Sequence, residues 1–245
     1  MIRGLYASAV GMQTNMNRMD VVSNNLANVD TAGFKRETAV QRSFTEELMH
    51  AMGGPNHHIT GPRRVGPVRL GNFVDEVHID FRNGPLRTTD NPFDFAIVGE
   101  GFFAISMTDR NGETTERFTR NGSFTLDQNR QLRTMEGHVV LGVDGGPITI
   151  PADGTLDISA LRIVNFENPQ SLRPFGDNTL NITPESVQVA FSGTVLVGYL
   201  ESSNVNPIRE MVEMIAIQRN YEANQRVLSI ADTTLQRAVN DIARR

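Results

Sequence analysis

The side chains best suited to chemistry in this 245-residue sequence are scattered carboxylates and two adjacent histidines. Asp94 and Glu100 could form the carboxylate pair of a glycosidase, judged by residue type alone. His57 and His58 could ligate a metal, but chain neighbours do not easily converge on one ion, and no carboxylate lies at helical spacing from them. No Ser-His-Asp order or phosphate loop stands out. We therefore expect no enzyme activity, no catalytic residue, no cofactor and no metal.

Two further groups could bind ions. Residues 109–112 resemble the start of a calcium loop, but the later ligands and the closing glutamate are missing, which favours a turn. Arg63, Arg64 and Arg69 form a local basic group without the aromatic residues that would stack on single-stranded nucleic acid. The net charge of -5 also argues against a nucleic-acid binder, whose phosphate contacts need a basic face.

The composition is that of a folded protein, with 39% hydrophobic and 21% charged residues. The sequence has no cysteine, which excludes disulfides and thiolate zinc sites and would suit a chain exposed to oxidising conditions. The N-terminus lacks the apolar core of a cleaved secretory signal. No apolar run approaches the roughly 20 residues of a membrane span, so we expect none.

A 3.5-residue repeat organises the C-terminal end of the chain. Asn206 and Pro207 form a helix-start signal, because asparagine can cap free amides and proline has none to leave unpaired. The repeat that follows predicts a coiled-coil-like helix of about 55 Å, at about 1.5 Å per residue. Its seam positions are Met214, Ile217, Tyr221, Asn224, Leu228, Ala231, Leu235, Ala238 and Ile242.

The N-terminal end carries the same repeat, at Ile2, Leu5, Ala9, Met12, Met16, Met19, Ser23 and Leu26. If the two helices pair, chain direction requires them to pair antiparallel. The polar residues of the first helix are mostly uncharged, which suits a surface that becomes covered. We therefore expect the seams to act in assembly between subunits; the alternative is that the helices fold back on the central domain.

The middle of the chain changes from helical to strand periodicity. Residues 36–75 contain glycine–proline breaks and predict an irregular connecting segment. Residues 76–202 contain short strand-like runs separated by turn signals, of which Asn121-Gly122 predicts a hairpin turn with positive φ. The expected fold is α+β: a terminal helical domain from residues 1–35 and 203–245, and an antiparallel β domain between them.

The end of the first predicted helix carries a recognisable motif. It resembles the bacterial flagellar rod and hook family of axial proteins, in which an Asn-Asn-Leu-Ala-Asn run is followed by threonine, glycine, phenylalanine and lysine. The matching residues are Asn24, Asn25, Leu26, Ala27, Asn28, Thr31, Gly33, Phe34 and Lys35.

The resemblance extends over most of the chain. Residues 91–103 are similar to the family's Gly-x-Gly-Phe-Phe region, and the stretch from Thr119 to Gly142 also matches, although Arg130 stands where glycine is common. That departure leaves the conformation of this turn open. The C-terminal signature is matched by Asn204, Asn206 and Pro207, followed by Glu210, Met214, Arg219, Tyr221 and Asn224.

The resemblance implies a structural subunit of the basal-body rod that polymerises with itself and with other rod and hook axial proteins. It implies helices lining an inner tube, an outer β layer, and delivery by the flagellar export apparatus without a cleaved signal. Residues 139–148 and 224–228 favour the proximal-rod type, and the Gly-Phe-Phe run at 101–103 is shared with the distal-rod type. Two less favoured alternatives are an enzyme built on the β domain and a surface-displayed β module on a helical stalk.

Overall fold

A computed structural model describes residues 2–43, 72–108, 114–151 and 157–243. It has a helix near each end of the chain and antiparallel strands between them, so the predicted α+β class is confirmed. The chain divides into two compact units. We call the described parts of 1–26, 37–78 and 207–245 the helical unit, and those of 27–36 and 79–206 the β unit.

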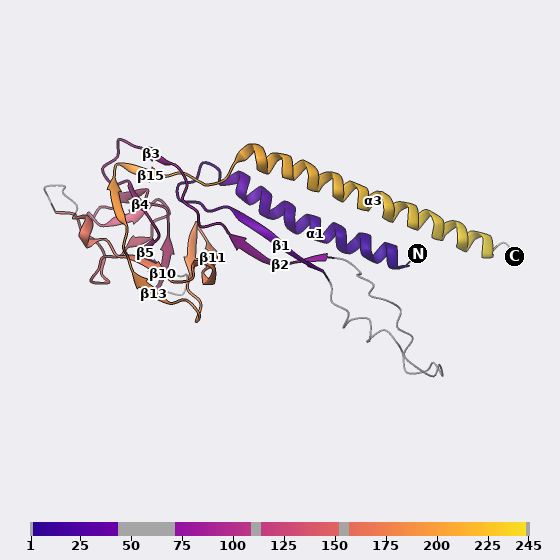
Figure 1. The fold of residues 1–245 in the computed structure, drawn as a ribbon, viewed down its shortest axis with the longest axis horizontal. Coiled ribbons are helices and arrows are strands. Elements are labelled where there is room, and N and C mark those ends of the chain that lie inside the picture. The colour runs from indigo at the N-terminus through magenta and orange to yellow at the C-terminus, as the bar shows by residue number, and fades with distance from the viewer. Residues whose placement is uncertain (1, 44–71, 109–113, 152–156, 244–245) are drawn as a thin grey trace. The chain divides into compact units, whose positions relative to one another are not determined.

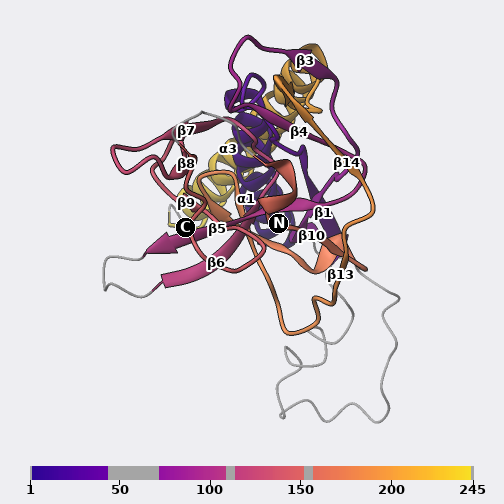
Figure 2. The same cartoon turned by 90° about the vertical axis from the view of Figure 1, so that its left-hand side faces the viewer.

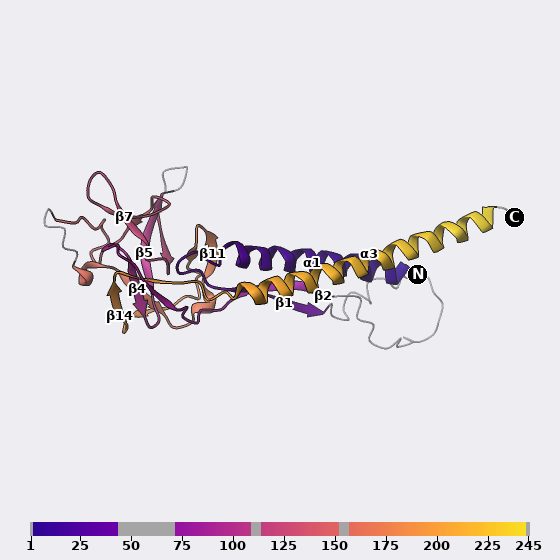
Figure 3. The ribbon, with the colours of Figure 1, turned by 90° about the horizontal axis from the view of Figure 1, so that it is seen from above.

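The helical unit is built on two helices, α1 (Ile2–Ala27) and α3 (Pro207–Ala243). They lie side by side with the two chain ends at the same end of the pair (Figures 1 and 3). Proline opens α3, as its start signal predicts. Because α3 has 37 residues and α1 has 26, α3 is longer by roughly 16 Å at about 1.5 Å per residue.

Two strands complete the helical unit, β1 (Glu37–Ser43) and β2 (Asn72–Ile79), which pair as a two-stranded sheet. The Arg42–Asp75 ion pair, at 3.1 Å, joins them. The prediction of an irregular segment over 36–75 is therefore wrong at both of its ends, and residues 44–71 lie outside the described residues. The glycine–proline breaks on which that prediction rests lie at positions 53–67, between the two strands in the sequence and not within either of them.

The domain boundaries also differ from those expected. Residues 27–36 belong to the β unit although they follow α1 directly, whereas residues 76–78 belong with the helices. The reason is that the turn after α1 makes its hydrogen bonds to strands of the β unit, such as that of the Gly33 amide to the Glu201 carbonyl at 2.7 Å. The chain thus passes between the two units four times.

The β unit consists of short antiparallel strands (Figure 2). Among the described residues nine of them form one sheet, in the order β11-β12-β6-β5-β9-β8-β7, with β10 joined to β5 and β13 to β10. Two smaller pairs are β4 with β14 and β3 with β15. The strands are β3 (Leu86–Thr88), β4 (Phe95–Val98), β5 (Phe102–Thr108), β6 (Thr114–Thr119), β7 (Phe124–Leu126), β8 (Leu132–Thr134), β9 (Val139–Val140), β10 (Ile163–Phe166), β11 (Arg173–Gly176), β12 (Thr179–Asn181), β13 (Gln188–Ala190), β14 (Thr194–Val197) and β15 (Tyr199–Glu201).

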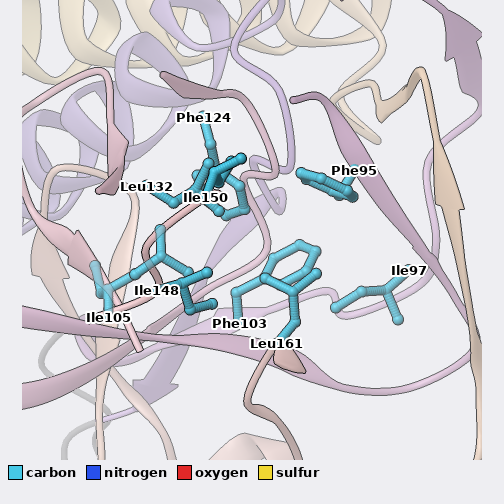
Figure 4. Close-up of a cluster of buried hydrophobic side chains, with 10 residues drawn as sticks. Phe95, Ile97, Phe103, Ile105, Phe124, Leu132, Ile148, Ile150 and Leu161 are labelled. Atoms are coloured by element: carbon cyan, nitrogen blue, oxygen red, sulfur yellow. The ribbon is translucent and has the colours of Figure 1, made fainter. Parts of the chain in front are cut away.

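Strand β5 is the centre of this unit because both of its faces are buried. Phe103 and Ile105 point into one apolar cluster, shown in Figure 4, together with Phe95, Phe124 and Leu132. Phe102 and Ala104 point into a second cluster on the other face. Successive side chains of a strand alternate between its faces, so a continuous apolar run is what a strand between two cores requires.

The Asn121-Gly122 pair does not form the predicted hairpin. β6 pairs with β5 and β12, and β7 pairs with β8. Gly122 is not among the residues with positive φ, so that part of the prediction is wrong. Asn121 instead accepts a hydrogen bond from the Ser123 amide at 3.0 Å, an Asx turn. By contrast, Arg130 has a φ of 60°, a conformation that explains why glycine is common there in the family.

Glycine is nevertheless required at position 122, for a steric reason. A Cβ there would lie 1.8 Å from the carbonyl oxygen of Phe95. We predict that Gly122→Val lowers the free energy of unfolding of the β unit by at least about 2 kcal/mol, the cost of overpacking a fixed backbone. Urea unfolding measures it. The control is Gly146→Ala, whose Cβ would meet nothing within 4 Å; equal stability losses in the two variants would contradict the prediction.

Candidate functional site: the helix pair and the signature residues

The predicted seam of α3 is its less exposed side. Ile217 is 1% exposed. The other predicted seam positions on either side of it are half-buried, namely Met214, Tyr221, Asn224, Leu228, Ala231, Leu235 and Ala238. The side chain of Ile242 lies outside the described residues. The burial is that of a helix with a neighbour along one stripe, while coiled-coil geometry stays a prediction.

The buried stripe of α1 differs from the predicted one. Leu5, Met12, Met19 and Leu26 are half-buried, but Met16 is 50% exposed. The most buried residues of α1 are Ser8, Thr14, Asn15, Val22 and Asn25. The cause is that α1 has two neighbours, α3 and the β1–β2 sheet, so polar side chains that find partners on either one are buried too.

Contacts along the two helices establish their direction. Arg18 forms an ion pair with Glu213 at 3.1 Å, and an added Cβ on Gly11 would lie 2.8 Å from the Asn224 amide nitrogen. As residue numbers fall on α1 they rise on α3, so the pair is antiparallel, as predicted.

Asn25 of the signature is the polar centre of the helical unit, with 0% exposure. Its amide nitrogen donates to the Glu37 carbonyl at 2.7 Å and to the Glu210 carboxylate at 3.1 Å, while its oxygen accepts from the Glu37 amide at 2.8 Å. The side chain thereby pairs with the first residue of β1 as a strand would. One asparagine joins α1, β1 and α3.

The β unit holds a buried ion cluster formed by three residues far apart in the sequence. The Glu201 carboxylate accepts from Lys35 Nζ at 2.7 Å and from Arg120 Nε at 2.6 Å. These side chains are 2%, 7% and 4% exposed for glutamate, lysine and arginine. Glu201 also accepts from the Gly84 amide at 2.8 Å. We call these three charged residues the ion triad.

Arg120 extends the ion triad to the surrounding backbone. Its guanidinium donates to the carbonyls of Gly101, Ile97 and Gly99, the last two at 2.9 and 2.6 Å. It also donates to Asn83 Oδ1 at 3.1 Å. Arginine carries five N–H donors in a planar fork, which lets one side chain fix several carbonyls at once.

The remaining signature residues arrange the chain around the ion triad. Gly33, with a φ of 69°, packs so closely that an added Cβ would lie 2.4 Å from the Arg120 carbonyl carbon. Asn204 accepts from the Arg36 amide at 2.7 Å and donates to the carbonyls of Asp80 and Arg82 at 2.8 and 3.0 Å. The side chain of Asn204 thus connects the segment at Arg36 to the segment at residues 80–82 through hydrogen bonds.

The other signature positions have smaller roles. Asn28 accepts from the Thr31 hydroxyl at 3.1 Å within the turn after α1, and Phe34 is buried. Asn24 and Ala27 are exposed.

The surroundings of the ion triad shift the pKa values of Glu201 and Lys35. Burial alone would raise the pKa of Glu201, but Arg120 and Lys35 outweigh it and hold that pKa below the ordinary value of 4.5. Burial lowers the pKa of Lys35, and its attraction to Glu201 offsets only part of this effect. We therefore treat Glu201 as ionised near neutral pH.

The candidate catalytic and ligand residues find no site in the described part of the chain. Asp94 is buried and accepts from the Asn91 amide at 2.9 Å, whereas Glu100 is exposed. Within the described ranges no group of three or more potential metal ligands converges, and neither helix has the length and apolarity to cross a membrane. His57, His58, the arginines of 63–69 and residues 109–112 lie outside those ranges.

The sequence did not predict that the three residues of the ion triad are buried together. The family motifs contain Lys35 and Arg120 but do not indicate that either residue is buried or pairs with Glu201. The available signal was their position: Lys35 follows Gly33-Phe34, Arg120 precedes Asn121-Gly122, and Glu201 ends a strand just before the Asn204 signature. Charged residues inside apolar, turn-flanked stretches are rarely buried unless paired.

Comparison with known proteins agrees with these signatures. Residues 5–35 match the model "Flagella basal body rod protein", residues 96–167 the model "Flagellar hook protein FlgE/F/G D1 domain", and residues 196–241 the model "Flagellar basal body rod FlgEFG protein C-terminal".

Similar proteins match along their whole length. The chain is 35% identical to the flagellar basal-body rod protein FlgG of Buchnera aphidicola subsp. Schizaphis graminum, over 97% of this chain and 98% of the relative. It is 29% identical to FlgG of Bacillus subtilis, over 98% and 99%. It is 27% identical to the flagellar hook-basal body complex protein FlhO of Bacillus subtilis, over 100% of both chains.

The three family models and the full-length relatives all describe structural proteins of the flagellar rod and hook. The chain belongs to the flagellar basal-body rod protein family, and it is a structural subunit of the rod.

The buried hydrogen bonds of Asn25 generate a prediction for the helical unit. Asn25→Ala leaves the Glu37 backbone without these partners, so we expect it to cost roughly 2–4 kcal/mol. Thermal melting followed by far-UV circular dichroism measures it. Asn24→Ala is the matched control, because Asn24 is exposed and its bond to Glu37 Oε2 is long, at 3.3 Å. Comparable melting shifts in both variants would refute the assignment.

The ion triad generates a prediction for the β unit. Glu201→Gln leaves two buried cations without their carboxylate, and we expect it to cost about 3–5 kcal/mol of the free energy of unfolding near pH 7. Urea unfolding measures it, with the exposed Glu185→Gln as control.

The pH dependence follows from the lowered pKa of Glu201. The unfolded chain takes up the proton more readily, so this stabilisation is present above the unfolded pKa and is lost as pH falls through the folded pKa. Glu201→Gln should flatten this part of the acid limb below about pH 4.5. An unchanged stability and an unchanged acid limb would show that Glu201 carries no such charge.

Proposed function

We propose that copies of this chain polymerise head to tail into the axial tube of the rod, through the helical unit. The observation that carries the proposal is apolar surface left open on α3. Ile208, Val212, Ile215 and Ile230 are 69%, 62%, 52% and 63% exposed. Large apolar side chains exposed on one face of a monomer indicate an interaction site. Head-to-tail contacts between unlike surfaces produce open filaments rather than closed rings when the rotation does not close.

The family supports the choice of partners and location. Rod and hook proteins assemble with one another, and the relatives' names describe rod and hook-basal body proteins, which supports the flagellar basal body as the site of this chain. Delivery by the flagellar export apparatus without a cleaved signal rests on the resemblance alone. We further propose that the chain is not an enzyme and binds no nucleic acid, consistent with its net charge of -5.

The axial position is a separate question. The names of the relatives specify the rod without a position along it. The proximal rod, predicted from residues 139–148 and 224–228, and the distal rod as its alternative therefore stay predictions. Fractionating intact basal bodies and locating the chain in an axial segment decides between them.

The seam of α3 supplies the test of assembly. Leu228→Asp or Leu235→Asp places a charge in the half-buried stripe, which would cost several kcal/mol if that stripe is desolvated in the polymer. We predict that these changes stop rod assembly, scored by electron microscopy of basal bodies, and leave the melting of the β unit unchanged.

Exposed positions on α3 provide the control. Gln218→Asp and Gln236→Asp place the same charge at exposed positions off both the seam and the face that carries Ile208, Val212, Ile215 and Ile230. They should assemble nearly normally. Normal assembly of both seam variants would show that the seam is not needed for assembly. Loss of the β unit in the soluble monomer would show that its stability depends on the helix pair, and would contradict the prediction that the seam acts within the helical unit alone.

A further inference from the structure

Several exposed apolar residues of α3 lie on one face, whereas the exposed Val227 and Val239 lie away from it. A helix turns by about 100° per residue, so steps of three and four keep residues on one side. The steps of three and four on the side of α3 opposite its seam are occupied by Ile208, Val212, Ile215, Arg219, Ala223, Arg226 and Ile230, and we call this the outer face of α3. Arg219 is exposed and forms no ion pair among the described residues. This face therefore offers apolar surface and an unpaired positive charge.

A complementary face lies on α1. Tyr6 and Met16 are 48% and 50% exposed on the side of α1 opposite its buried stripe. Asp20, on the same side, is exposed and likewise has no ion pair within the described part of the chain. With Ala9 these residues form what we call the outer face of α1, which offers apolar surface and an unpaired negative charge.

These two faces cannot meet within one copy, because α1 and α3 pack through their opposite sides. In a head-to-tail polymer neighbouring copies share one orientation, and inside each copy the two helices are antiparallel. The α3 of one copy therefore meets the α1 of a similarly oriented neighbour antiparallel.

We propose that the outer face of α3 packs antiparallel against the outer face of α1 on a second copy of this chain, with Arg219 opposite Asp20. This register also sets Ala223 against Met16 and Ile230 against Ala9, so that a small residue faces a large one in both of these pairs. Interdigitation of small and large side chains is what close helix packing requires. The inference rests on the proposed function and specifies which surfaces meet.

The lack of cysteine makes a direct test possible. Full-length chains carrying only Met16→Cys are mixed with full-length chains carrying only Ala223→Cys, allowed to polymerise, and oxidised. Any mixed disulfide must then join two copies. We expect a disulfide-linked dimer containing both variants. The register control replaces Ala223→Cys by Val212→Cys, on the same face but about 16 Å away along the helix, which should give little mixed dimer.

The outcomes separate this inference from the proposed function. Polymer that forms without a mixed disulfide, or with equal yields from Ala223→Cys and Val212→Cys, overturns the inference and leaves polymerisation standing. A wild-type chain that never polymerises alone or on a rod end overturns the proposed function and the inference with it.

Charge reversal provides a second measurement on exposed positions that do not hold either unit together. Asp20→Arg and Arg219→Asp, each alone, should raise the critical concentration for polymerisation about tenfold, through like charges at one contact. The double variant should return to near the wild-type value, because the pair is restored in reverse. If the double variant polymerises no better than the weaker single variant, the two residues are not neighbours in the polymer.

Discussion

The β unit depends on one buried carboxylate placed between two buried cations. Glu201 lies at the end of the last strand, Lys35 comes from the turn after α1, and Arg120 comes from the middle of the chain. Removing two cations from water is costly unless a counterion and further hydrogen-bond acceptors surround them, and here the acceptors are backbone carbonyls. The correct arrangement of these segments is therefore also the one that satisfies the charges.

The two units use polarity in opposite ways. In the β unit the charged residues of the ion triad are buried, and apolar clusters cover both faces of β5. In the helical unit several polar side chains of α1 are buried, while apolar residues of α3 are exposed. In a protein that acts as a monomer, we would expect large apolar side chains such as Ile208 and Ile230 to be buried. Their exposure fits a subunit whose helices gain their final neighbours in a polymer.

The sequence was informative wherever a local signal decides the structure. The 3.5-residue repeat predicted the less exposed side of α3, Pro207 predicted its start, and the short runs between turn signals predicted antiparallel strands in the middle of the chain. Local signals gave the wrong structure, or no prediction, where the conformation of a residue depends on a partner far away in the sequence. The Asn121-Gly122 pair suggested a hairpin, yet the approach of the Phe95 carbonyl explains its glycine. The ion triad joins residues separated by 81 and 166 positions, which no periodicity reveals.

The central claim is that contacts to Glu201 hold the β unit together, and amide hydrogen exchange tests it most directly. The Gly33 and Gly84 amides donate to the Glu201 carbonyl and carboxylate at 2.7 and 2.8 Å. The account predicts that both exchange only on global unfolding of the β unit, as slowly as the amides of β5. Exchange of either amide through local opening, while β5 stays protected, would contradict it.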